Sequence, residues 1–383
     1  MDFSFTDEQM LLADSLTECL KRNFTQEDFN KAYENEEFPM DAWKALADNG
    51  FLAIGAPEEF GGTPADLVTQ TLVAYLINKY GGPLAGFYTL GMTTLRDLHE
   101  FGSDEHKKLI VEQYLKGGTP FALGMSEPNA GSDVAGLQTS YVHDGDNVII
   151  NGSKHYNTIA NQVDYILLLA KDAAVENVYQ AVTMFILPAD TPGVEITTLP
   201  KLGGKNPLHI CEIFLKDVVL PKSMILGAEH AGFKQSMKNF EIERIASVAG
   251  SLAVAENAFE DAAAYANQRV QYGRPIGENQ LIQEKIFEMK MNVELMRSYL
   301  FRVAWMKDQD MDVRVDHALL KYFMVQTCQK VVDDAVQVLG GLGLVGNHRV
   351  MKYYCECRSS RIGAGSDQVM IFSTAPQILK QFK

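Results

Sequence analysis

The sequence predicts an α+β protein with an N-terminal helical bundle, a middle antiparallel β-barrel or sandwich, and a C-terminal four-helix bundle. Hydrophobic residues recur with helical spacing up to about residue 118, and short β-prone runs occupy the next hundred or so residues. Helical spacing then returns near Gly232 and continues to the end. A chain of 383 residues is long enough for two or three such units. We therefore expect domains at 1–119, 120–231 and 232–383.

The N-terminal region opens with the pattern of a capping box. Thr6-Asp-Glu-Gln9 places a hydroxyl and a carboxamide three residues apart, just ahead of a face of leucines. Its charged residues follow the solvent-facing positions, so we expect a packed bundle and no catalytic group here. Further helices are expected near 40–50, 65–81, 88–101 and 104–115, separated by glycine turns such as Gly61-Gly62 and Gly81-Gly82-Pro83.

The middle region consists of short runs rich in β-branched and aromatic residues. Turn residues such as Asp144-Gly-Asp-Asn147 and Asn151-Gly-Ser153 break up these runs, and no helical pattern intervenes. A doubly wound nucleotide-binding fold is therefore disfavoured. The expected strands are Phe121–Met125, Val148–Asn151, Tyr165–Ala170, Val182–Leu187 and His209–Leu215.

The C-terminal region is expected to be helical over about 233–271, 278–308, 314–340, 350–360 and 368–381. Within it, Gly341-Leu-Gly-Leu-Val-Gly346 matches the G-x-G-x-x-G dinucleotide fingerprint. The preceding residues form a helical pattern where that fingerprint requires a strand, so we reject it. The glycines instead allow a turn or a close approach to a flat ligand.

Composition excludes several classes of function. A net charge of −15 argues against nucleic acid as a partner, and no apolar run approaches the roughly 18 residues of a membrane span. The N-terminus lacks a basic targeting segment. Five scattered cysteines indicate reduced thiols and a cytoplasmic setting. We expect no metal site, because Cys355-x-Cys357 has no second pair and the eight histidines show no metal spacing.

A charged trio interrupts the apolar pattern near the start of the long helix that follows Gly232. Glu241, Glu243 and Arg244 lie within Asn239–Gly250, ahead of an apolar helical run. These charges fit either a helix terminus with an ion pair or a buried catalytic carboxylate. The trio alone does not decide between the two.

The loop Ser126-Glu-Pro-Asn-Ala-Gly-Ser-Asp133 follows an expected strand and offers small residues, a hydroxyl and backbone donors for phosphate oxygens. As a bare pattern it also fits an ordinary loop. However, Met125–Gly136 resembles the T-E-P-G-A-G-S-D signature of the acyl-CoA dehydrogenases. The resemblance extends to Gln268–Gly277 and Gln337–Gly343, and so covers essentially the whole chain. Within that family the chain is most similar to the crotonobetainyl-CoA reductase branch, through Ala262–Arg269, Ile282–Lys285 and Arg361–Asp367.

This resemblance implies FAD as cofactor, an acyl-CoA thioester as substrate, an electron-transferring flavoprotein as redox partner and a homotetramer. It assigns Ser126, Gly131 and Ser132 to the flavin and its pyrophosphate, and Tyr156 and Thr158 to the isoalloxazine ring. It assigns Arg244 and Glu241 to the pantetheine arm. The neighbouring His155 is expected to pack or to orient the cofactor loop. Across a subunit boundary, the adenine half would contact Arg269, Tyr272, Gln280, Gln337, Gly340 and Gly341, with Ser366 and Gln368 completing the set.

The chain departs from the family pattern at the usual catalytic base. Most members carry that base in Tyr-Glu-Gly-Thr, whereas this chain reads Gly363-Ala-Gly-Ser366. The isovaleryl and long-chain members, which this chain resembles in reading Glu-Arg on the equivalent helix, draw their base from there. Glu243 matches that residue. A carboxyl group in a dry pocket has a raised pKa, which suits proton exchange at the α carbon while the flavin exchanges hydride with the β carbon.

The resemblance also implies that the backbone N–H at Ala364 and a flavin ribityl hydroxyl hold the thioester oxygen. The small residues Gly363 and Ala364 enlarge the pocket floor, which is consistent with a branched or trimethylammonium-bearing acyl group. The hypothesis is therefore an enzyme that interconverts an acyl-CoA and its 2,3-enoyl-CoA, such as γ-butyrobetainyl-CoA and crotonobetainyl-CoA. The alternatives are a catalytically inactive CoA-ester-binding or flavoprotein-docking subunit, and an acyl-CoA oxidase.

Overall fold

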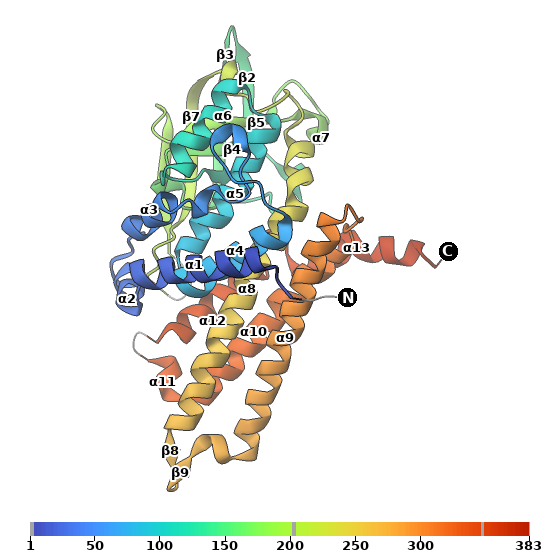
Figure 1. Ribbon diagram of the computed structural model, residues 1–383. Coiled ribbons are helices and arrows are strands. Elements are labelled where there is room, and N and C mark those ends of the chain that lie inside the picture. The colour runs from blue at the N-terminus through green and yellow to red at the C-terminus, as the bar shows by residue number, and fades with distance from the viewer. Residues whose placement is uncertain (1–3, 201–203, 346–347, 383) are drawn as a thin grey trace. The chain divides into compact units, whose positions relative to one another are not determined.

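The structure is a computed structural model that describes residues 4–200, 204–345 and 348–382, apart from the side chains of Glu112 and residues 239–241 (Figure 1). It contains two compact units. The first comprises Met1–Phe24, Ala65–Ala85 and Glu243–Lys383, and the second comprises Thr25–Pro64 and Gly86–Ile242. Helical segments at both ends of the chain and a β-rich middle confirm the predicted fold class.

The expected helices begin and end close to the expected positions, whereas α2, α7 and α11 are additions that the sequence pattern did not reveal, and α7 is a short helix in the middle region where none was expected. None of the helices described is long and apolar enough to cross a membrane. The helices are α1 (Asp7–Asn23), α2 (Gln26–Asn35), α3 (Met40–Asp48), α4 (Leu67–Gly81), α5 (Leu84–Phe101), α6 (Asp104–Ile110), α7 (Val178–Ala181), α8 (Gly232–Gln268), α9 (Gln280–Asp308), α10 (Asp316–Leu339), α11 (Gly341–Leu344), α12 (Arg349–Ser360) and α13 (Asp367–Lys380).

The predicted capping box at the start of α1 is confirmed. Gln9 donates its backbone N–H to the Thr6 hydroxyl at 3.2 Å, and its side chain accepts from the Thr6 amide at 3.1 Å. The same reciprocal arrangement starts α2 at Thr25 and α6 at Ser103. Each box satisfies amide donors that the first turn of a helix leaves without a partner.

The first unit is a bundle built around α8, α9, α10 and α12, with α1 and α4 packed alongside (Figure 1). One face of α10 is fully buried, including Leu320, Met324, Val331 and Ala335. These residues follow the spacing of three or four that places side chains on one face of a helix. The long helices therefore derive their stability from tertiary packing of apolar faces.

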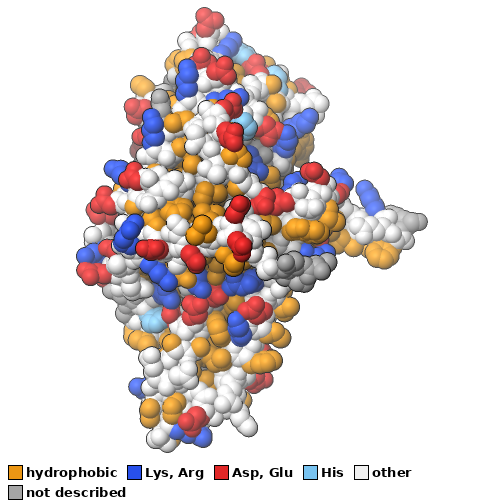
Figure 2. Space-filling model, in the orientation of Figure 1, with side chains coloured by type: hydrophobic (Ala, Val, Ile, Leu, Met, Phe, Trp, Pro, Cys, Tyr) orange, Lys and Arg blue, Asp and Glu red, His pale blue; other side chains and the backbone are white. Residues whose placement is uncertain are grey.

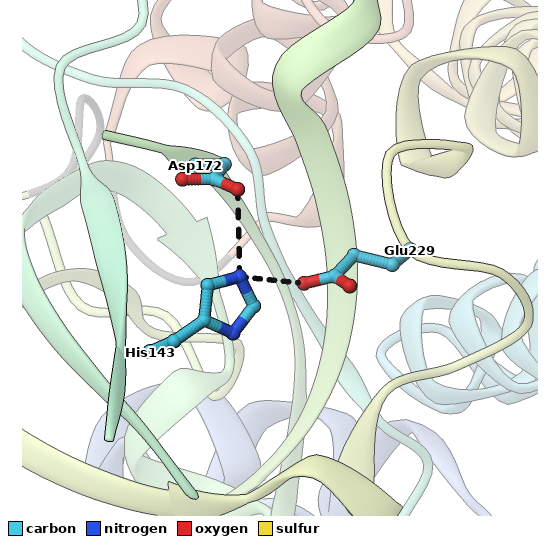
Figure 3. Close-up of side chains that lie close together, drawn as sticks. All are labelled: His143, Asp172 and Glu229. Atoms are coloured by element: carbon cyan, nitrogen blue, oxygen red, sulfur yellow. Dashed lines mark ion pairs between the residues drawn. The ribbon is translucent and has the colours of Figure 1, made fainter. Parts of the chain in front are cut away.

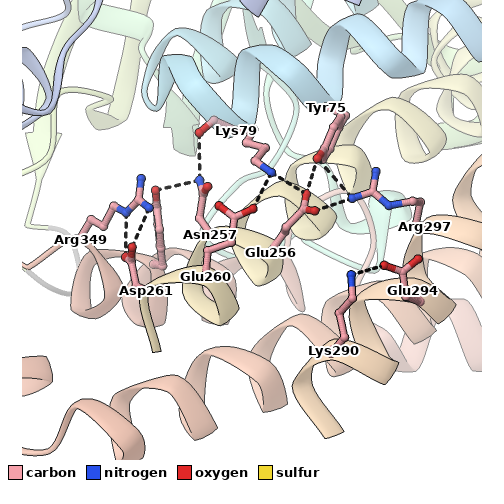
Figure 4. Close-up of polar contacts among 11 residues, drawn as sticks. Tyr75, Lys79, Glu256, Asn257, Glu260, Asp261, Lys290, Glu294, Arg297 and Arg349 are labelled. Atoms are coloured by element: carbon pink, nitrogen blue, oxygen red, sulfur yellow. Dashed lines mark hydrogen bonds and ion pairs between the residues drawn. The ribbon is translucent and has the colours of Figure 1, made fainter. Parts of the chain in front are cut away.

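A polar network ties α4 to α8 and α9 inside this unit (Figure 4). Arg297 donates to Glu256 at 2.6 Å, Lys79 lies 3.1 Å from the same carboxylate, and the Tyr75 hydroxyl donates to it as well. Burial disfavours the charge on Glu256, but these partners outweigh it and lower the pKa of Glu256. At the other end of the network, Arg349 binds Asp261 through two hydrogen bonds of 2.8 Å.

The second unit contains a seven-stranded sheet in the order β1-β4-β2-β3-β7-β6, with β5 paired to β4. Most pairings are antiparallel, whereas β1 and β2 both run parallel to β4. The strands are β1 (Ala122–Gly124), β2 (Ser140–Asp144), β3 (Asn147–Thr158), β4 (Tyr165–Asp172), β5 (Val182–Pro188), β6 (Val194–Leu199) and β7 (Ile210–Pro221); β8 (Val270–Gln271) and β9 (Arg274–Pro275) form a separate hairpin in the first unit.

The prediction that Asn151-Gly-Ser153 breaks a strand is wrong. Gly152 lies inside the twelve-residue strand β3, at a shift in its register with β7. Its φ is +148°, and a Cβ there would lie 2.6 Å from the Cα of Thr139. The glycine therefore permits a bulge and a close backbone approach within the strand. The other expected turn, at Gly145, does join β2 to β3.

The core of the second unit lies against the buried strands β4 and β5. Leu167, Leu169, Met184 and Ile186 are almost completely inaccessible to solvent and pack with Leu98 of α5. Because both faces of β4 are covered, its sequence reads as a continuous apolar run. The loop after β1 begins at this core, and β4 ends beside it at the polar residue Asp172.

Candidate active site

A buried ion pair anchors the loop 126–136. Glu127 accepts backbone N–H bonds from Gln138 at 2.6 Å and from Thr139 at 3.0 Å. Lys154 of β3, which is fully buried, donates to the same carboxylate at 2.8 Å and to the carbonyl of Met125 at 3.3 Å. Although burial disfavours its charge, Glu127 has a lowered pKa because Lys154, Thr139 and Gln138 stabilise the carboxylate.

The predicted flavin-contacting residues of this loop face outward from that anchor. Gly131 and Ser132 are exposed, and a Cβ on Gly131 would meet nothing within 4 Å. In the described part of the chain, their amides donate to no acceptor. Adjacent amides with open space in front of them suit the oxygens of a pyrophosphate. The loop therefore fits the phosphate half of a dinucleotide.

Tyr156 and Thr158 lie on β3, beside that loop. The amide of His155 donates to the carbonyl of Ser126 at 2.8 Å, which joins the strand to the loop. Tyr156 has a φ of +62°, and its side chain is 67% exposed. This conformation is uncommon for a residue with a Cβ and turns an aromatic ring towards solvent. The Nδ1 atom of His155 lies 2.6 Å from Glu212.

The six residues assigned to the adenine half gather at one end of the helical unit. Lys285 of α9 binds Asp334 of α10 at 2.6 Å, and this register brings the start of α9 to the end of α10. The residues are all exposed in the single chain, and Tyr272 is completely so. They are Arg269, Tyr272, Gln280, Gln337, Gly340 and Gly341.

The charged trio lies within α8, several residues after its start at Gly232, so it does not mark a helix terminus. Glu243 is half-buried, and its Oε2 atom is inaccessible to solvent. The side chain of Glu241 lies outside the described residues. A carboxylate oxygen shielded from solvent is more typical of a catalytic group than of a carboxylate on a solvated helix surface.

Arg244 links α8 to the loop 363–366. Its Nε donates to the carbonyl of Ala364 at 3.1 Å, and its Nη1 donates to Nε2 of His317 at 2.9 Å. The other ring nitrogen of His317 lies 2.9 Å from the carbonyl of Val313. This pattern places the proton of a neutral imidazole on Nδ1. The arginine is thereby fixed in position between α10 and the loop.

Lys321 of α10 holds the next residue of the same loop. Its ammonium group donates to the carbonyl of Gly365 at 2.6 Å, and the side chain is 2% exposed. Burial lowers the pKa of Lys321 to about 8, opposed by Asp367 and assisted by Arg244. Ala364 has a φ of +52° and Gly365 a φ of +92°. The left-handed conformation is costly for Ala364 but not for Gly365, and the two cations stabilise this turn.

Asp367 is a second acid close to this loop, but its contacts indicate a structural role. Arg361 donates to it at 2.8 Å and Gln326 at 2.7 Å, and it is 4% exposed at the start of α13. Both donors bind the same carboxylate oxygen, Oδ2, and so join α13 to Arg361 and to α10. Ser366 caps this helix by accepting from the amide of Val369, and Gln368 is exposed.

Sequence reasoning missed the residues that support the two loops. Glu127 lies inside the recognised motif, but its burial was not apparent. Lys154, His317 and Lys321 are distant from the loops in sequence and carry no motif of their own. The available signal was a lysine in an otherwise apolar helical face, as at Lys321, which requires a buried acceptor.

Comparisons with known proteins match the whole arrangement. The models for the N-terminal, middle and C-terminal domains of acyl-CoA dehydrogenases match residues 6–118, 122–218 and 230–379. The probable acyl-CoA dehydrogenase YdiO of Escherichia coli is 41% identical over 384 residues, covering 100% of both chains. The chain belongs to the acyl-CoA dehydrogenase family, and it is an oxidoreductase acting on CH–CH bonds of acyl-CoA thioesters.

Solved structures agree with this assignment. The butyryl-CoA dehydrogenase of Megasphaera elsdenii is 27% identical and superposes with a TM-score of 0.91, covering 99% of this chain and 100% of that one. A glutaryl-coenzyme A dehydrogenase in its glutaryl-CoA complex is 25% identical, also with a TM-score of 0.91, covering 99% and 97% of the respective chains.

The ion pair under loop 126–136 predicts an acid-sensitive stability. Because the pKa of Glu127 is lowered by folding, its contribution is present above the pKa of an unfolded glutamate and is lost as the pH falls through the folded value. Glu127→Gln should lower the free energy of unfolding by about 3–5 kcal/mol at pH 7, since Lys154 stays buried. Urea unfolding of both proteins at pH 7 and near pH 4 should show that the difference in their free energies of unfolding is smaller at the lower pH.

The matched control is Glu195→Gln on the exposed face of β6, which should change stability by less than about 0.5 kcal/mol. If Glu127→Gln behaved like this control at neutral pH, the proposed anchor would be unnecessary.

The contact of Lys321 with Gly365 predicts an effect on turnover. Lys321→Met keeps the aliphatic stem but leaves the carbonyl without this donor, so the loop should move from its productive position. We expect kcat to fall by about ten- to a hundredfold, the scale of a misplaced reacting group. Lys330→Met removes a lysine from the exposed face of the same helix and should leave steady-state kinetics unchanged. Equal behaviour of the two variants would exclude a positioning role.

Proposed function

We propose that this chain is an FAD-dependent acyl-CoA dehydrogenase or enoyl-CoA reductase in which Glu243 exchanges the α proton of the thioester. The observation that carries the proposal is the arrangement on α8. Glu243 has a buried carboxylate oxygen, and the adjacent Arg244 donates to Ala364, which stands where most family members carry their base. Glu243 is thus adjacent in sequence to Arg244, whose side chain holds the carbonyl of Ala364.

The backbone of the 363–366 loop supports this proposal. Ala364 retains an amide, and within the described residues that amide donates to no acceptor. A thioester oxygen needs such donors as negative charge develops on it. Arg244 and Lys321 hold the carbonyls of Ala364 and Gly365, and so orient the peptide groups of the loop. Proton exchange and oxygen stabilisation would then come from two rigidly connected elements.

FAD is proposed as the cofactor because two separate sets of residues fit it. Ser126, Gly131 and Ser132 would hold the pyrophosphate, and Tyr156 and Thr158 would lie against the ring. When bound, FAD would exchange hydride with the β carbon. The six exposed residues at the end of the helical unit would bind the adenine half of a cofactor carried by another subunit. They are Arg269, Tyr272, Gln280, Gln337, Gly340 and Gly341, and Ser366 and Gln368 would complete the contacts.

A homotetramer is consistent with the exposed apolar surface of the helical unit. Phe287, Met291 and Leu295 recur every four residues along α9 and are 71%, 45% and 51% exposed. Hydrophobic side chains are visible over this helical unit, with acidic and basic side chains interspersed among them (Figure 2). Such a stripe on a long helix commonly packs against another copy.

The finer details of the function rest on the resemblance. We propose crotonobetainyl-CoA and γ-butyrobetainyl-CoA as the substrate pair, because Gly363 and Ala364 leave room for a trimethylammonium group. An electron-transferring flavoprotein would be the redox partner. The five free thiols support a cytoplasmic setting. The domain boundaries at 1–119, 120–231 and 232–383 belong to this proposal as well.

Substitution of the proposed base gives the sharpest test of the residue. Glu243→Gln should retain FAD and acyl-CoA binding but lose at least about two to three orders of magnitude in turnover, the usual contribution of a positioned acid or base. The matched control is Glu288→Gln on the surface of α9. The Glu288 carboxylate is partly exposed to solvent and forms an ion pair with Lys330. Near-normal turnover of Glu243→Gln would end its assignment as the base.

An anaerobic absorbance titration tests the function itself. The purified yellow protein should bleach when mixed with one member of a panel of saturated acyl-CoA thioesters that includes γ-butyrobetainyl-CoA. If esters bind without bleaching, chemically reduced protein is mixed with enoyl-CoAs to test the reverse reaction. Failure in both directions would favour the inactive docking subunit, an alternative suggested by Ala364. Aerobic release of hydrogen peroxide without added acceptor would favour an oxidase.

A further inference from the structure

Three potential metal ligands converge at the C-terminal ends of two parallel strands in the second unit, and none of them is assigned to substrate or cofactor. They are His143 at the end of β2, Asp172 at the end of β4, and Glu229 in the segment between β7 and α8 (Figure 3). One ligand atom from each lies within 4.8 Å of the other two. A second histidine, His230, lies beside them, with its Nε2 3.0 Å from Asp172.

The sheet register explains how the ligands meet. Tyr141 of β2 pairs with Asp172 of the parallel strand β4. His143 follows Tyr141 by two residues and therefore lies on the same face of the sheet. The segment before α8 is brought to this face because Leu226 donates to Met184 at 2.8 Å and His230 donates its amide to the Thr183 hydroxyl at 2.8 Å.

The distances fit a shared cation better than a simple ion pair. Nε2 of His143 lies 3.5 Å from Asp172 and 3.4 Å from Glu229. Charge-assisted hydrogen bonds are usually about 2.7–2.9 Å long, and a single N–H cannot point at two carboxylates together. In contrast, ligands about 2.0–2.1 Å from a tetrahedral metal lie about 3.3–3.4 Å from one another. The two separations from His143 match those edges, and the carboxylate oxygens of Asp172 and Glu229 lie within 4.8 Å of each other.

Neighbouring groups already orient the carboxylate ligands. Asp172 is 5% exposed, and its other oxygen accepts the amide of Ala174 at 2.9 Å. The Tyr141 hydroxyl donates to Glu229 at 2.9 Å. Hydrogen bonds of this kind fix the ligands of natural metal sites and are needed for their affinity. His143 is 41% exposed at its side chain, so an ion can reach the cluster from solvent.

We propose that His143, Asp172 and Glu229 bind a divalent transition-metal ion of the zinc class. Imidazole combined with carboxylates favours such ions over magnesium or calcium, which prefer oxygen ligands alone. Water completes the coordination, and His230 supports Asp172 through its hydrogen bond. The bound ion cross-links β2, β4 and the segment that leads into α8, so its role is structural. The proposal is independent of the proposed flavin chemistry.

The histidine spacing gave no indication of this site, because its ligands come from three separate segments. His143 and Asp172 are brought together by strand pairing, and Glu229 by the return of the chain after β7. The expectation of no metal site considered only ligands close together in sequence.

Calorimetric titration with zinc chloride tests the proposal on the full-length, flavin-loaded protein, with any affinity tag removed and prior metal stripped by a chelator. We expect one zinc ion per chain and a higher Tm in its presence, because the ion binds the folded state. Magnesium chloride should give no binding heat. Cobalt(II), used as a coloured substitute, should show the visible absorption of a low-symmetry tetrahedral site.

Matched variants locate the site. His143→Ala and Glu229→Gln should each weaken zinc binding by at least about tenfold, since even outer-shell changes have effects of that size. His99→Ala should bind as wild type does, because His99 is equally exposed, 42%, and lies 3.5 Å from Glu59, without a second carboxylate in that pair. Equal zinc affinity in His143→Ala and His99→Ala, or no binding to wild type, would overturn the proposal and leave an ion-pair cluster.

Discussion

Two candidate ligand-binding loops, one in each unit, depend on the same kind of interaction: a cation at least partly shielded from solvent that donates to a loop carbonyl. In the second unit, Lys154 donates to Met125 and to Glu127 beneath the loop 126–136. In the first unit, Arg244 and Lys321 donate to consecutive carbonyls of the loop 363–366. Loops with few apolar contacts are held poorly by the hydrophobic effect, whereas charged donors in a low-dielectric interior fix individual peptide groups. The exposed amides of each loop then remain available to ligands.

Under the proposed function, the same interaction would let the site work without the family's usual base. With Ala at position 364, the loop no longer supplies a carboxylate, but its backbone keeps the left-handed turn and the amide. Arg244 connects that turn to the helix carrying Glu243. The proposed base on α8 would then act beside this loop backbone, provided that the cations hold the loop. In this proposal the proton is exchanged by a side chain of α8, whereas the shape of the loop depends on its backbone, so the two can change independently.

The cluster of His143, Asp172 and Glu229 shows a different use of the same sheet. The apolar centre of β4 ends in Asp172, and the rigid strand sets the position of that carboxylate. The loop residues Glu229 and His230 are brought to it by hydrogen bonds to β5. The left-handed backbone of His230, with a φ of +64°, turns its ring back towards Asp172. A segment without regular structure is thereby fixed immediately before the longest helix.

The sequence by itself determined the order of helical and β regions, the capping box at Thr6 and the family, because each depends on residues close together along the chain. It also identified Glu243 as a candidate base from the paired change at Ala364. It did not distinguish a turn from a bulge at Gly152, because that glycine is explained only by the approach of Thr139. Only the tertiary structure decided the partners of Lys154, Arg244 and Lys321, and the meeting of His143 with Glu229. These contacts join segments separated by tens to more than a hundred residues, and a local pattern carries no information about which distant group satisfies a buried charge.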